Sequence, residues 1–328
     1  MKDKVLITGA SGFVGFHLIE AALEKNLEVY AAIRKSSNVQ HLQGYNIQFT
    51  YPDFTNADSL KKDIEEKGYK YIIHAAGATK AKRQEDYNEI NAEYTYNIIK
   101  AAEQSGVDVQ KIVMMSSLAA IGPLNNIQDA ITETTVAAPV TQYGKSKLLA
   151  EKRLSTSPLP WIILRPTAVY GPREKDIFML FKSIGRGMEP YIGKIQQQLS
   201  FIYVKDLAAI TVNALFSPVS HAIYNITDGR AYDRYELANL IKKELNRKTL
   251  RFHIPMPLIR ALAVTMEKTY GFLNRVPVLN REKLNELAAT NWYCNIEKIQ
   301  QELGFKPRYN LESGLKETVE WYKQQGWL

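Results

Sequence analysis

The chain has 328 residues, of which 45% are hydrophobic and 23% are charged, so it can bury one large core or two smaller ones. It contains no apolar run of the roughly 20 residues that a membrane span requires, and its single cysteine, Cys294, excludes an intrachain disulfide. With no signal-peptide pattern at the N-terminus, these features predict a cytoplasmic protein without an integral membrane segment. The net charge of +8 suits an anionic partner such as a phosphorylated cofactor, and the basic residues are dispersed, so no nucleic-acid partner is expected.

Strand-like and helix-like segments alternate through the first half of the chain. Short apolar runs predict strands, and these lie at 5–8, 27–33, 47–51, 69–74, 111–115 and 161–164. Segments with helical spacing lie between them, at 13–25, around 60–64, at 84–104 and at 143–154. The alternation predicts an α/β fold of the Rossmann type, a doubly wound parallel sheet with helices on both faces.

After Pro172 the alternation becomes looser and prolines separate shorter elements. We predict a nucleotide-binding domain from residues 1–171 with 201–228, because 201–226 is expected to return to the main sheet. Residues 172–200 with 229–328 are predicted to form a smaller substrate-binding part. Within it, the apolar stretch 254–279 carries Arg260, Glu267 and Lys268. This stretch predicts an amphipathic helix that lines a substrate cleft or a subunit contact, with a helix on a membrane surface as the alternative.

Three glycines follow the first strand in the sequence Gly9-Ala-Ser-Gly12-Phe-Val-Gly15. Glycine permits tight turns and close backbone approach, and a helix that begins here can hold a pyrophosphate on its N-terminal N–H groups. The spacing is a variant of the dinucleotide-binding fingerprint. A structural turn is the alternative interpretation of the glycines alone.

Arg34 and Lys35 stand where the second strand should end. An acidic residue at this position binds a ribose 2′-hydroxyl, whereas an arginine accommodates a 2′-phosphate. NADP(H) is therefore the preferred cofactor and NAD(H) the other possibility. Two solvated surface cations are the alternative.

Tyr143 and Lys147 are four residues apart at the start of a predicted helix, so their side chains share one face. A nearby cation favours the phenolate, and this spacing predicts that Lys147 lowers the pKa of Tyr143. Such a pair can exchange a proton with a carbonyl or an alcohol. Ser116 and Ser117 follow a strand at the carboxyl edge of the sheet, where a hydroxyl can hold the substrate oxygen.

With these motifs, nearly the whole chain resembles the extended short-chain dehydrogenase/reductase family, also called the NAD-dependent epimerase/dehydratase superfamily. The residues that carry the resemblance are Thr8–Gly15, Asp53-Phe54, His74–Gly77, Asn91, Thr95, Asn97, the triad Ser117, Tyr143 and Lys147, Arg165–Pro172, and Tyr203–Ala208. Tyr94 departs from the family pattern, since it replaces a glycine. The resemblance implies that Ser117, Tyr143 and Lys147 are the catalytic residues.

The motifs and the resemblance together imply a set of residues around the cofactor. They are Gly9, Ser11, Gly12, Phe13, Val14, Gly15, Arg34, Lys35, Asp53, Phe54, Ala75, Ala76, Gly77, Asn91, Ser116, Tyr143, Lys147, Pro166, Thr167 and Val169. Besides Ser117, the substrate is expected to contact four residues chosen by position, namely Lys80, Arg173, Phe201 and Tyr203. The five histidines are scattered without ligand spacing, so no metal site is expected. Family members commonly form homodimers through helices equivalent to 85–104 and 141–156.

The residues after Ser117 indicate which class of reaction is expected. Leu118 and Ala119 replace the acidic pair that is typical of the sugar dehydratases, and neither can act as an acid or a base, so dehydration is disfavoured. The segment is more similar to the dihydroflavonol-reductase-like and hydroxysteroid-dehydrogenase-like branch. The sequence thus predicts an NAD(P)-dependent oxidoreductase acting on a small-molecule carbonyl or secondary alcohol. A nucleotide-sugar epimerase with tightly bound NAD and a non-catalytic NADP(H)-binding regulator are the alternatives.

Overall fold

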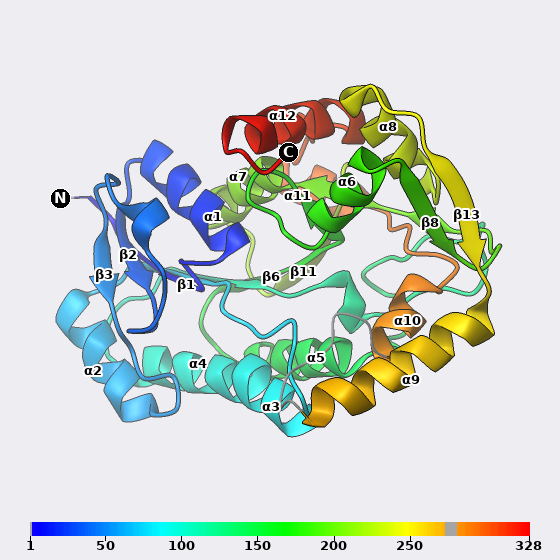
Figure 1. Cartoon of the computed structure of the whole chain (residues 1–328). Helices are drawn as coiled ribbons and strands as arrows, with labels where there is room; N and C mark the ends of the chain where they lie inside the picture. Colours follow the sequence, from blue (N-terminus) through cyan, green and yellow to red (C-terminus); the bar gives the residue numbers. More distant parts are fainter. Residues whose placement is uncertain (1, 273–280) are drawn as a thin grey trace.

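A parallel β-sheet forms the centre of the protein (Figure 1). The computed structural model describes residues 2–272 and 281–328, and within them the main sheet has seven strands in the order β11–β6–β5–β4–β1–β2–β3. The strands are β1 (Lys4–Thr8), β2 (Glu28–Ala32), β3 (Gln48–Thr50), β4 (Tyr71–His74), β5 (Lys111–Met115), β6 (Trp161–Pro166) and β11 (Ala222–Ile226). Every neighbouring pair is parallel. The predicted doubly wound α/β fold is confirmed, and residues 201–226 return to the sheet through β11.

The middle residues of the central strands β1, β4, β5 and β6 are apolar and buried because both faces of the sheet are covered there. Side chains alternate between the faces, so Val5 and Ile7 join one core cluster while Leu6 joins the other. In β4, Ile73 and Ile72 divide between the two clusters in the same way. Burying each such side chain contributes about 1.5–3 kcal/mol.

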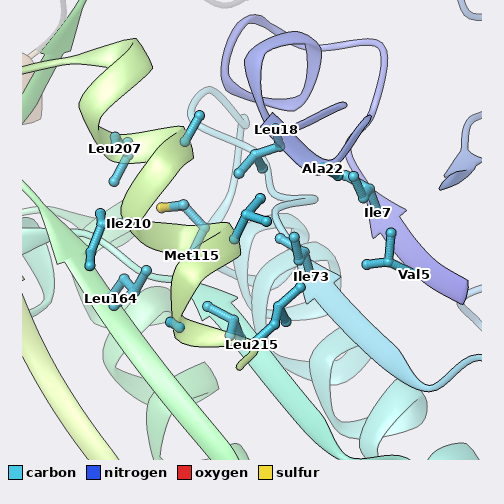
Figure 2. Packing of buried hydrophobic residues seen from close by; sticks show 14 of the residues in the cluster. Val5, Ile7, Leu18, Ala22, Ile73, Met115, Leu164, Leu207, Ile210 and Leu215 are labelled. Atoms are coloured by element: carbon cyan, nitrogen blue, oxygen red, sulfur yellow. The ribbon is translucent and has the colours of Figure 1, made fainter. Parts of the chain in front are cut away.

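Helices cover the two faces in separate groups (Figure 1). α1 (Phe13–Glu24) and α7 (Val204–Ala214) pack together on one face, and α2 (Ala57–Lys67), α4 (Tyr94–Gln104) and α5 (Gln142–Leu154) pack on the other. Figure 2 shows the first of these interfaces, where side chains from α1 and from α7 and its C-terminal end meet the sheet. The helical side chains Leu18, Ala22, Leu207, Ile210 and Leu215 pack in one cluster with the strand side chains Val5, Ile7, Ile73, Met115 and Leu164.

The segment 84–104, predicted as one long helix, is interrupted. It consists of α3 (Gln84–Asn88), a π-helical turn, η2 (Glu89–Glu93), and α4. A π-turn holds one residue more than an α-turn and often occurs at functional sites. Here it contains Asn91, one of the expected cofactor residues, which is 1% exposed.

The C-terminal half adds short strands and helices beside the sheet. The strands are β7 (Ala168–Tyr170), β8 (Met188–Ile192), β9 (Gln198–Leu199), β10 (Phe201–Tyr203), β12 (Tyr232–Asp233) and β13 (Leu250–Ile254). The helices are α6 (Phe178–Gly185), α8 (Glu236–Leu245), α9 (Met256–Phe272), α10 (Arg281–Leu287), α11 (Glu297–Leu303) and α12 (Leu311–Gln324), and single 3-10 turns lie at η1 (Gln40–Leu42) and η3 (Leu118–Ala120). The main hydrophobic core of the C-terminal half is rich in aromatic rings. The ring centroids of Phe178 and Tyr322, for example, are 4.7 Å apart.

The apolar stretch 254–279 forms the end of β13 and then α9, and its residues 273–279 lie outside the described ranges. α9 is amphipathic as predicted, with Ile259 and Ala263 buried against α10 and Leu258 and Leu262 exposed. None of the helices in the two described ranges combines the length and apolar character needed to span a bilayer.

The order of the strands reverses between β1 and β4. The chain moves outward through β2 and β3, then crosses back to build β4, β5, β6 and β11 on the other side of β1. In such sheets ligands bind outside the carboxyl ends of the strands where the order reverses. Thr8 and His74 end the two strands and are register partners, so they mark this position.

Gly15→Ala should destabilise the protein. A Cβ at residue 15 would lie 2.1 Å from the backbone oxygen of Gly9, which cannot move without disturbing β1. We expect the free energy of unfolding, measured by urea denaturation, to fall by about 1–3 kcal/mol. Gly185→Ala in α6 is the control, because a Cβ there meets open space, and it should change stability by less than about 1 kcal/mol. Equal stability of both variants would contradict the packing described here.

Candidate active site

The glycine loop brings three backbone segments into direct contact. Gly9 has φ +69°, and a Cβ there would lie 2.7 Å from the carbonyl oxygen of Ala75 in the loop after β4. Gly15 places the first turn of α1 against Gly9. Only glycine fits at these two positions, so the loop after β1 and the loop after β4 lie against each other at the point where the strand order reverses.

The N-terminus of α1 is suited to an anion. Its N-cap is Gly12, which has no side chain to cap the helix, and its first turn, Phe13-Val14-Gly15, contains no acidic residue. The N–H groups of such a turn and the positive end of the helix dipole attract a phosphate group. The neighbouring Ser11 backbone forms a hydrogen bond with the His41 ring, whose pKa is nevertheless lowered by burial and by the charge of Arg173.

At the other end of the expected cofactor site, Arg34 and Lys35 are exposed directly after β2. Phe54 stacks on Tyr94 with 6.0 Å between ring centroids and 22° between planes. Burial raises the pKa of Tyr94, and the nearby charge of Arg34 opposes this rise. Arg34, Phe54 and Tyr94 are therefore neighbours, and Tyr94 is a site residue that the sequence indicated only by its replacement of a glycine.

Asp53 faces its own loop. Its carboxylate accepts hydrogen bonds from the backbone N–H of Thr55 at 3.0 Å and from the Thr55 hydroxyl at 2.7 Å. These bonds lower the pKa of Asp53. Asn97 donates from its amide to the carbonyl oxygen of Phe54 at 2.9 Å, so the Asp53-Phe54 pair is held to α4.

A buried hydrogen-bond chain through His74 connects the loops. The Thr95 hydroxyl donates to the carbonyl oxygen of Asn91 at 2.6 Å, so it accepts from Nε2 of His74 at 2.9 Å. Nδ1 of His74 then accepts from the Thr8 hydroxyl at 2.9 Å, and Thr8 accepts from the N–H of Ala76 at 2.9 Å. All donors point in one direction along this chain. Burial and the charge of Lys147 lower the pKa of His74 to about 3, so the ring is neutral.

Asn91 holds the loop that follows β4. Its Oδ1 accepts from the N–H of Ala78 at 2.7 Å, and its amide donates to the carbonyl oxygen of Ala78 at 3.0 Å and to the Ser146 hydroxyl at 2.8 Å. A Cβ on Gly77 would lie 2.9 Å from Oδ1 of Asn91 and 3.1 Å from Nζ of Lys147. Gly77 therefore lies directly against the expected catalytic lysine.

The three expected catalytic side chains come together at the carboxyl edge of β5. Ser117 caps η3, and Thr141 caps α5 by accepting from the N–H of Gly144 at 3.0 Å. A Cβ on Gly144 would lie 2.2 Å from the carbonyl oxygen of Ala119, so glycine is required for α5 to approach η3 this closely. This approach brings Tyr143, in the first turn of α5, next to the Ser117 side chain, which is close enough to affect the pKa of Tyr143.

The protonation states differ from those that the spacing predicts. Burial raises the pKa of Tyr143 to about 12, and the charge of Glu286 adds to the rise, while the hydrogen bond with Ser117 opposes it. The predicted lowering is therefore wrong for the net direction, because burial outweighs the favourable contacts. Burial also lowers the pKa of Lys147 to about 8, and its Nζ donates to the carbonyl oxygen of Met115 at 2.9 Å.

A buried ion pair lies one helical turn beyond Lys147. Arg165 of β6 donates to both carboxylate oxygens of Glu151, at 2.9 and 2.6 Å, and both side chains are at least 95% buried. Ser116 donates to the same carboxylate at 2.5 Å. The negative charge of Glu151 counteracts the lowering of the Lys147 pKa. The sequence analysis missed Glu151, although its position four residues after Lys147 was a usable signal.

The segment after β6 runs beside the same edge. Pro166 ends β6, the N–H of Thr167 donates to the carbonyl oxygen of Ile226 at 3.1 Å, and Val169 packs on the core. The Thr167 hydroxyl is buried without a hydrogen-bond partner among the described residues. An unpartnered buried hydroxyl at the carboxyl edge fits a polar ligand group, so this segment fits the expected cofactor.

The residues expected to contact substrate make contacts with other protein groups. Lys80 pairs with Asp176 at 2.8 Å, and the Arg173 guanidinium lies 4.4 Å from the centroid of the Phe16 ring. Phe201 and Tyr203 are buried in the aromatic core of the C-terminal half. A substrate role for these four residues remains a prediction.

Helix α10 is next to Tyr143, and the sequence did not indicate this proximity. A carboxylate oxygen of Glu282 accepts from the N–H of Gln142 at 3.3 Å, at the start of α5. Glu286, one turn further along α10, is close enough to raise the pKa of Tyr143. Residues far apart in the sequence thus form one wall around Tyr143.

Comparison with known proteins adds a family match. Residues 5–227 match the model of the NAD dependent epimerase/dehydratase family. A ceramide reductase of Caulobacter vibrioides is 26% identical, covering 99% of this chain and 96% of that protein. The decarboxylating sterol-4-alpha-carboxylate 3-dehydrogenase of Schizosaccharomyces pombe is 26% identical, with 97% of each chain covered. A crystal structure of UDP-glucose 4-epimerase with UDP-glucose from Thermotoga maritima superposes with a TM-score of 0.81 at 20% identity, covering 98% of this chain and 99% of that one, and it shares the fold.

The buried His74 should make stability fall as the solution is acidified. Its folded pKa of about 3 lies below the ordinary value of 6.5, so the unfolded state binds the proton first and stability is lost as pH falls through 6.5. Between pH 7 and pH 5, wild type should lose about 2 kcal/mol more unfolding free energy than His74→Gln.

The measurement is urea denaturation at both pH values. His221→Asn is the control, because His221 is exposed and asparagine tolerates its positive φ, and this variant should follow wild type. A pH dependence that is the same in wild type and His74→Gln would show that His74 is protonated in the folded protein.

Proposed function

Since the chain belongs to the NAD-dependent epimerase/dehydratase family, and is thereby an enzyme of nicotinamide-dependent oxidation and reduction, we propose that it transfers a hydride between NADP(H) and a carbonyl or secondary alcohol. The observation that carries this proposal is the close approach of α5 to η3 at Gly144, which places Tyr143 beside Ser117, with Lys147 one turn further along α5. Leu118 and Ala119 carry no acid or base, which argues against dehydration.

In the proposed mechanism Ser117 and Tyr143 hydrogen-bond the substrate oxygen. The cofactor, when bound, supplies or accepts the hydride. Tyr143 exchanges the proton at its phenol oxygen. With its pKa raised to about 12, Tyr143 carries this proton at neutral pH, as a donor to a carbonyl oxygen must.

Lys147 acts as a positioned cation in this proposal. Its ammonium is fixed between the carbonyl oxygen of Met115 and the Gly77 loop. Glu151 counteracts the lowering of the Lys147 pKa by burial, and the ion pair with Arg165 holds Glu151 in place. A positive charge here stabilises negative charge that develops on the Tyr143 oxygen as its proton leaves.

The residues present fit a dinucleotide cofactor. The glycine cradle and the N-terminus of α1 would hold its pyrophosphate, and the remaining expected residues line the edge of the sheet between Arg34 and Thr167. NADP(H) is the proposed form because Arg34 and Lys35 are exposed beside the Phe54–Tyr94 stack. We propose residues 1–171 with 201–228 as the cofactor-binding domain and the remainder as the substrate-binding part.

A lipid is the proposed substrate class. Among the relatives that match nearly the full chain, two have names that specify ceramide and a sterol carboxylate, which are lipids, while the name of another specifies a UDP-glucose 4-epimerase. We propose that this chain also acts on an amphiphile with a carbonyl or hydroxyl group near its polar end. The protein is further proposed to act in the cytoplasm as a homodimer formed through the helices within 85–104 and 141–156.

Tyr143→Phe should abolish hydride transfer while leaving cofactor binding intact. Removing the phenol oxygen removes the proton donor, so we expect a loss of about 100-fold or more in turnover. NADPH oxidation in a carbonyl-substrate screen measures the rate, and fluorescence titration measures cofactor binding. Tyr87→Phe is the control, because its ring lies 6.4 Å from that of Tyr143 but its hydroxyl is directed to the carbonyl oxygen of Thr79.

Retained activity in Tyr143→Phe would refute the proposed mechanism. NAD that stays tightly bound through purification and does not exchange would instead favour the self-recycling epimerase. Binding of NADP(H) without hydride exchange in wild type would favour the regulatory protein.

Arg34→Ala should weaken the binding of NADPH much more than that of NADH. A charged hydrogen bond to the 2′-phosphate contributes about 1.5–3 kcal/mol, so the dissociation constant for NADPH should rise roughly ten- to 100-fold. Calorimetric titration of both cofactors measures the ratio. Lys25→Ala removes an exposed charge at the opposite end of α1 and should change neither affinity. Equal losses for the two cofactors would remove Arg34 from phosphate recognition.

A further inference from the structure

Strands β8 and β13 and helix α9 present an exposed apolar face that the proposed chemistry does not use. β8 and β13 pair in parallel as a two-stranded ribbon, and β13 leads directly into α9 through Pro255. The exposed large apolar side chains of these elements are Met188, Leu250, Phe252, Leu258 and Leu262, with exposed fractions of 44%, 73%, 37%, 62% and 50%. We call these five residues the ribbon–helix face.

In the two-stranded ribbon, the exposed apolar side chains lie on one side because alternate residues of a strand point to the same side. Leu250 and Phe252 point to the same side of β13, and Met188 is the register partner of Leu250. The opposite side carries Arg251, which pairs with the buried Glu189 of β8. The apolar side of the ribbon is therefore exposed, and the opposite side carries the ion pair with the buried Glu189.

The helix half is one stripe along α9. Leu258 and Leu262 are one turn apart, and Thr265 and Thr269 continue the exposed surface. The hydroxyls of both threonines donate to backbone carbonyl oxygens one turn back, at 2.9 and 3.0 Å. Their polar groups are thus satisfied within the helix, and the stripe can enter an apolar medium at low cost. Ile254 joins the two halves, because it ends β13 and packs with Ile259 of α9.

Basic residues predominate around this face, although α9 also carries Glu267. From Leu245 to Met266 the chain has four lysines and arginines and no aspartate or glutamate. Arg247, Lys248 and Arg260 are exposed in this stretch, and Arg186 is exposed just before β8. Exposed apolar side chains interleaved with exposed cations match the surface of an anionic bilayer, where the apolar groups enter the headgroup boundary and the cations meet the lipid phosphates.

The ribbon–helix face is also close to the catalytic tyrosine. The buried side of α9, with Ile259 and Ala263, packs on Leu284 of α10. On the same helix α10, Glu282 bonds to the backbone at the start of α5, directly before Tyr143. Figure 1 shows α10 between α9 and α5. One helix therefore separates the exposed stripe from the candidate active site.

We propose that the ribbon–helix face binds the surface of an anionic lipid bilayer and so presents the active site to an amphiphilic substrate in that bilayer. The part concerning the substrate rests on the proposed function, whereas binding to the bilayer does not. The face binds at the membrane surface, with α9 lying in the plane of the headgroups.

The experiment is sedimentation of the purified full-length protein with vesicles. Vesicles of equimolar phosphatidylcholine and phosphatidylglycerol are compared with vesicles of phosphatidylcholine alone, at low and high salt. Wild type should bind the anionic vesicles, and high salt should weaken binding. Leu258→Glu with Leu262→Glu, and separately Arg247→Glu with Lys248→Glu, should each lower the partition coefficient by about tenfold or more.

Phe216→Glu is the matched control, because Phe216 is an apolar residue of similar exposure, 47%, that follows α7 far along the chain from the face. It should bind vesicles as wild type does. NADPH oxidation with a water-soluble carbonyl compound should be unchanged in the leucine variant, which also shows that the variant is folded. If neither wild type nor any variant oxidised NADPH, this result would count against the proposed function, whereas the vesicle-binding result would still test the membrane proposal.

Three outcomes would overturn the proposal. The first is that wild type does not bind anionic vesicles at low salt. The second is that the leucine variant binds as strongly as wild type. The third is that the leucine variant changes the oligomeric state in light scattering without affecting vesicle binding, which would make the face an interface between copies of this chain.

Discussion

The site depends on backbone approaching backbone more closely than any side chain would permit. At Gly9 the loops after β1 and β4 are in contact, at Gly15 α1 rests on the loop that precedes it, and at Gly144 α5 rests on η3. The contacts at Gly15 and Gly144 each bring the N-terminus of a helix to the carboxyl edge of the sheet. One of these helices supplies N–H groups suited to a phosphate, and the other supplies Tyr143 and Lys147. Cofactor and catalytic groups can meet because three side chains are absent.

Burial then sets the electrostatics of the site. Lys147 is desolvated, which lowers its pKa, but Glu151 is buried beside it and restores part of the preference for the charged form. Glu151 is itself stabilised by Arg165 and Ser116. A buried charge without a partner would cost several kcal/mol, so the cluster has to be complete to be tolerated. The buried position of Lys147, the proposed catalytic cation, therefore depends on Glu151, Arg165 and Ser116, which lie outside the proposed triad.

Much of the fold could be predicted because local signals determine it. Strands buried on both faces give continuous apolar runs such as Val5–Thr8, and the glycine loop and the Tyr143–Lys147 spacing are contained in short segments. Contacts between distant segments could not be predicted in this way. The sequence around Glu151 does not indicate Arg165 as its partner, and that of α10 does not indicate that Glu286 lies near Tyr143. The predicted direction of the Tyr143 pKa shift was wrong for the same reason, because the burial of the ring depends on residues from distant segments of the chain.

The π-turn at Glu89–Glu93 has a consequence for how this segment tolerates change in length. Consecutive residues of an α-helix are rotated by about 100° around its axis, so a residue added to a regular helix turns everything beyond it to a different face. A π-turn absorbs one additional residue locally, and α4 keeps Ile98, Ile99 and Ala102 in the core while Asn91 reaches the loop after β4. Deleting a single residue there would turn the π-turn into a regular α-helical turn. Either the core residues of α4 would then rotate out of the core, or Asn91 would lose its hydrogen bonds to Ala78. The segment therefore has a fixed residue count, in contrast to surface loops, whose length can vary.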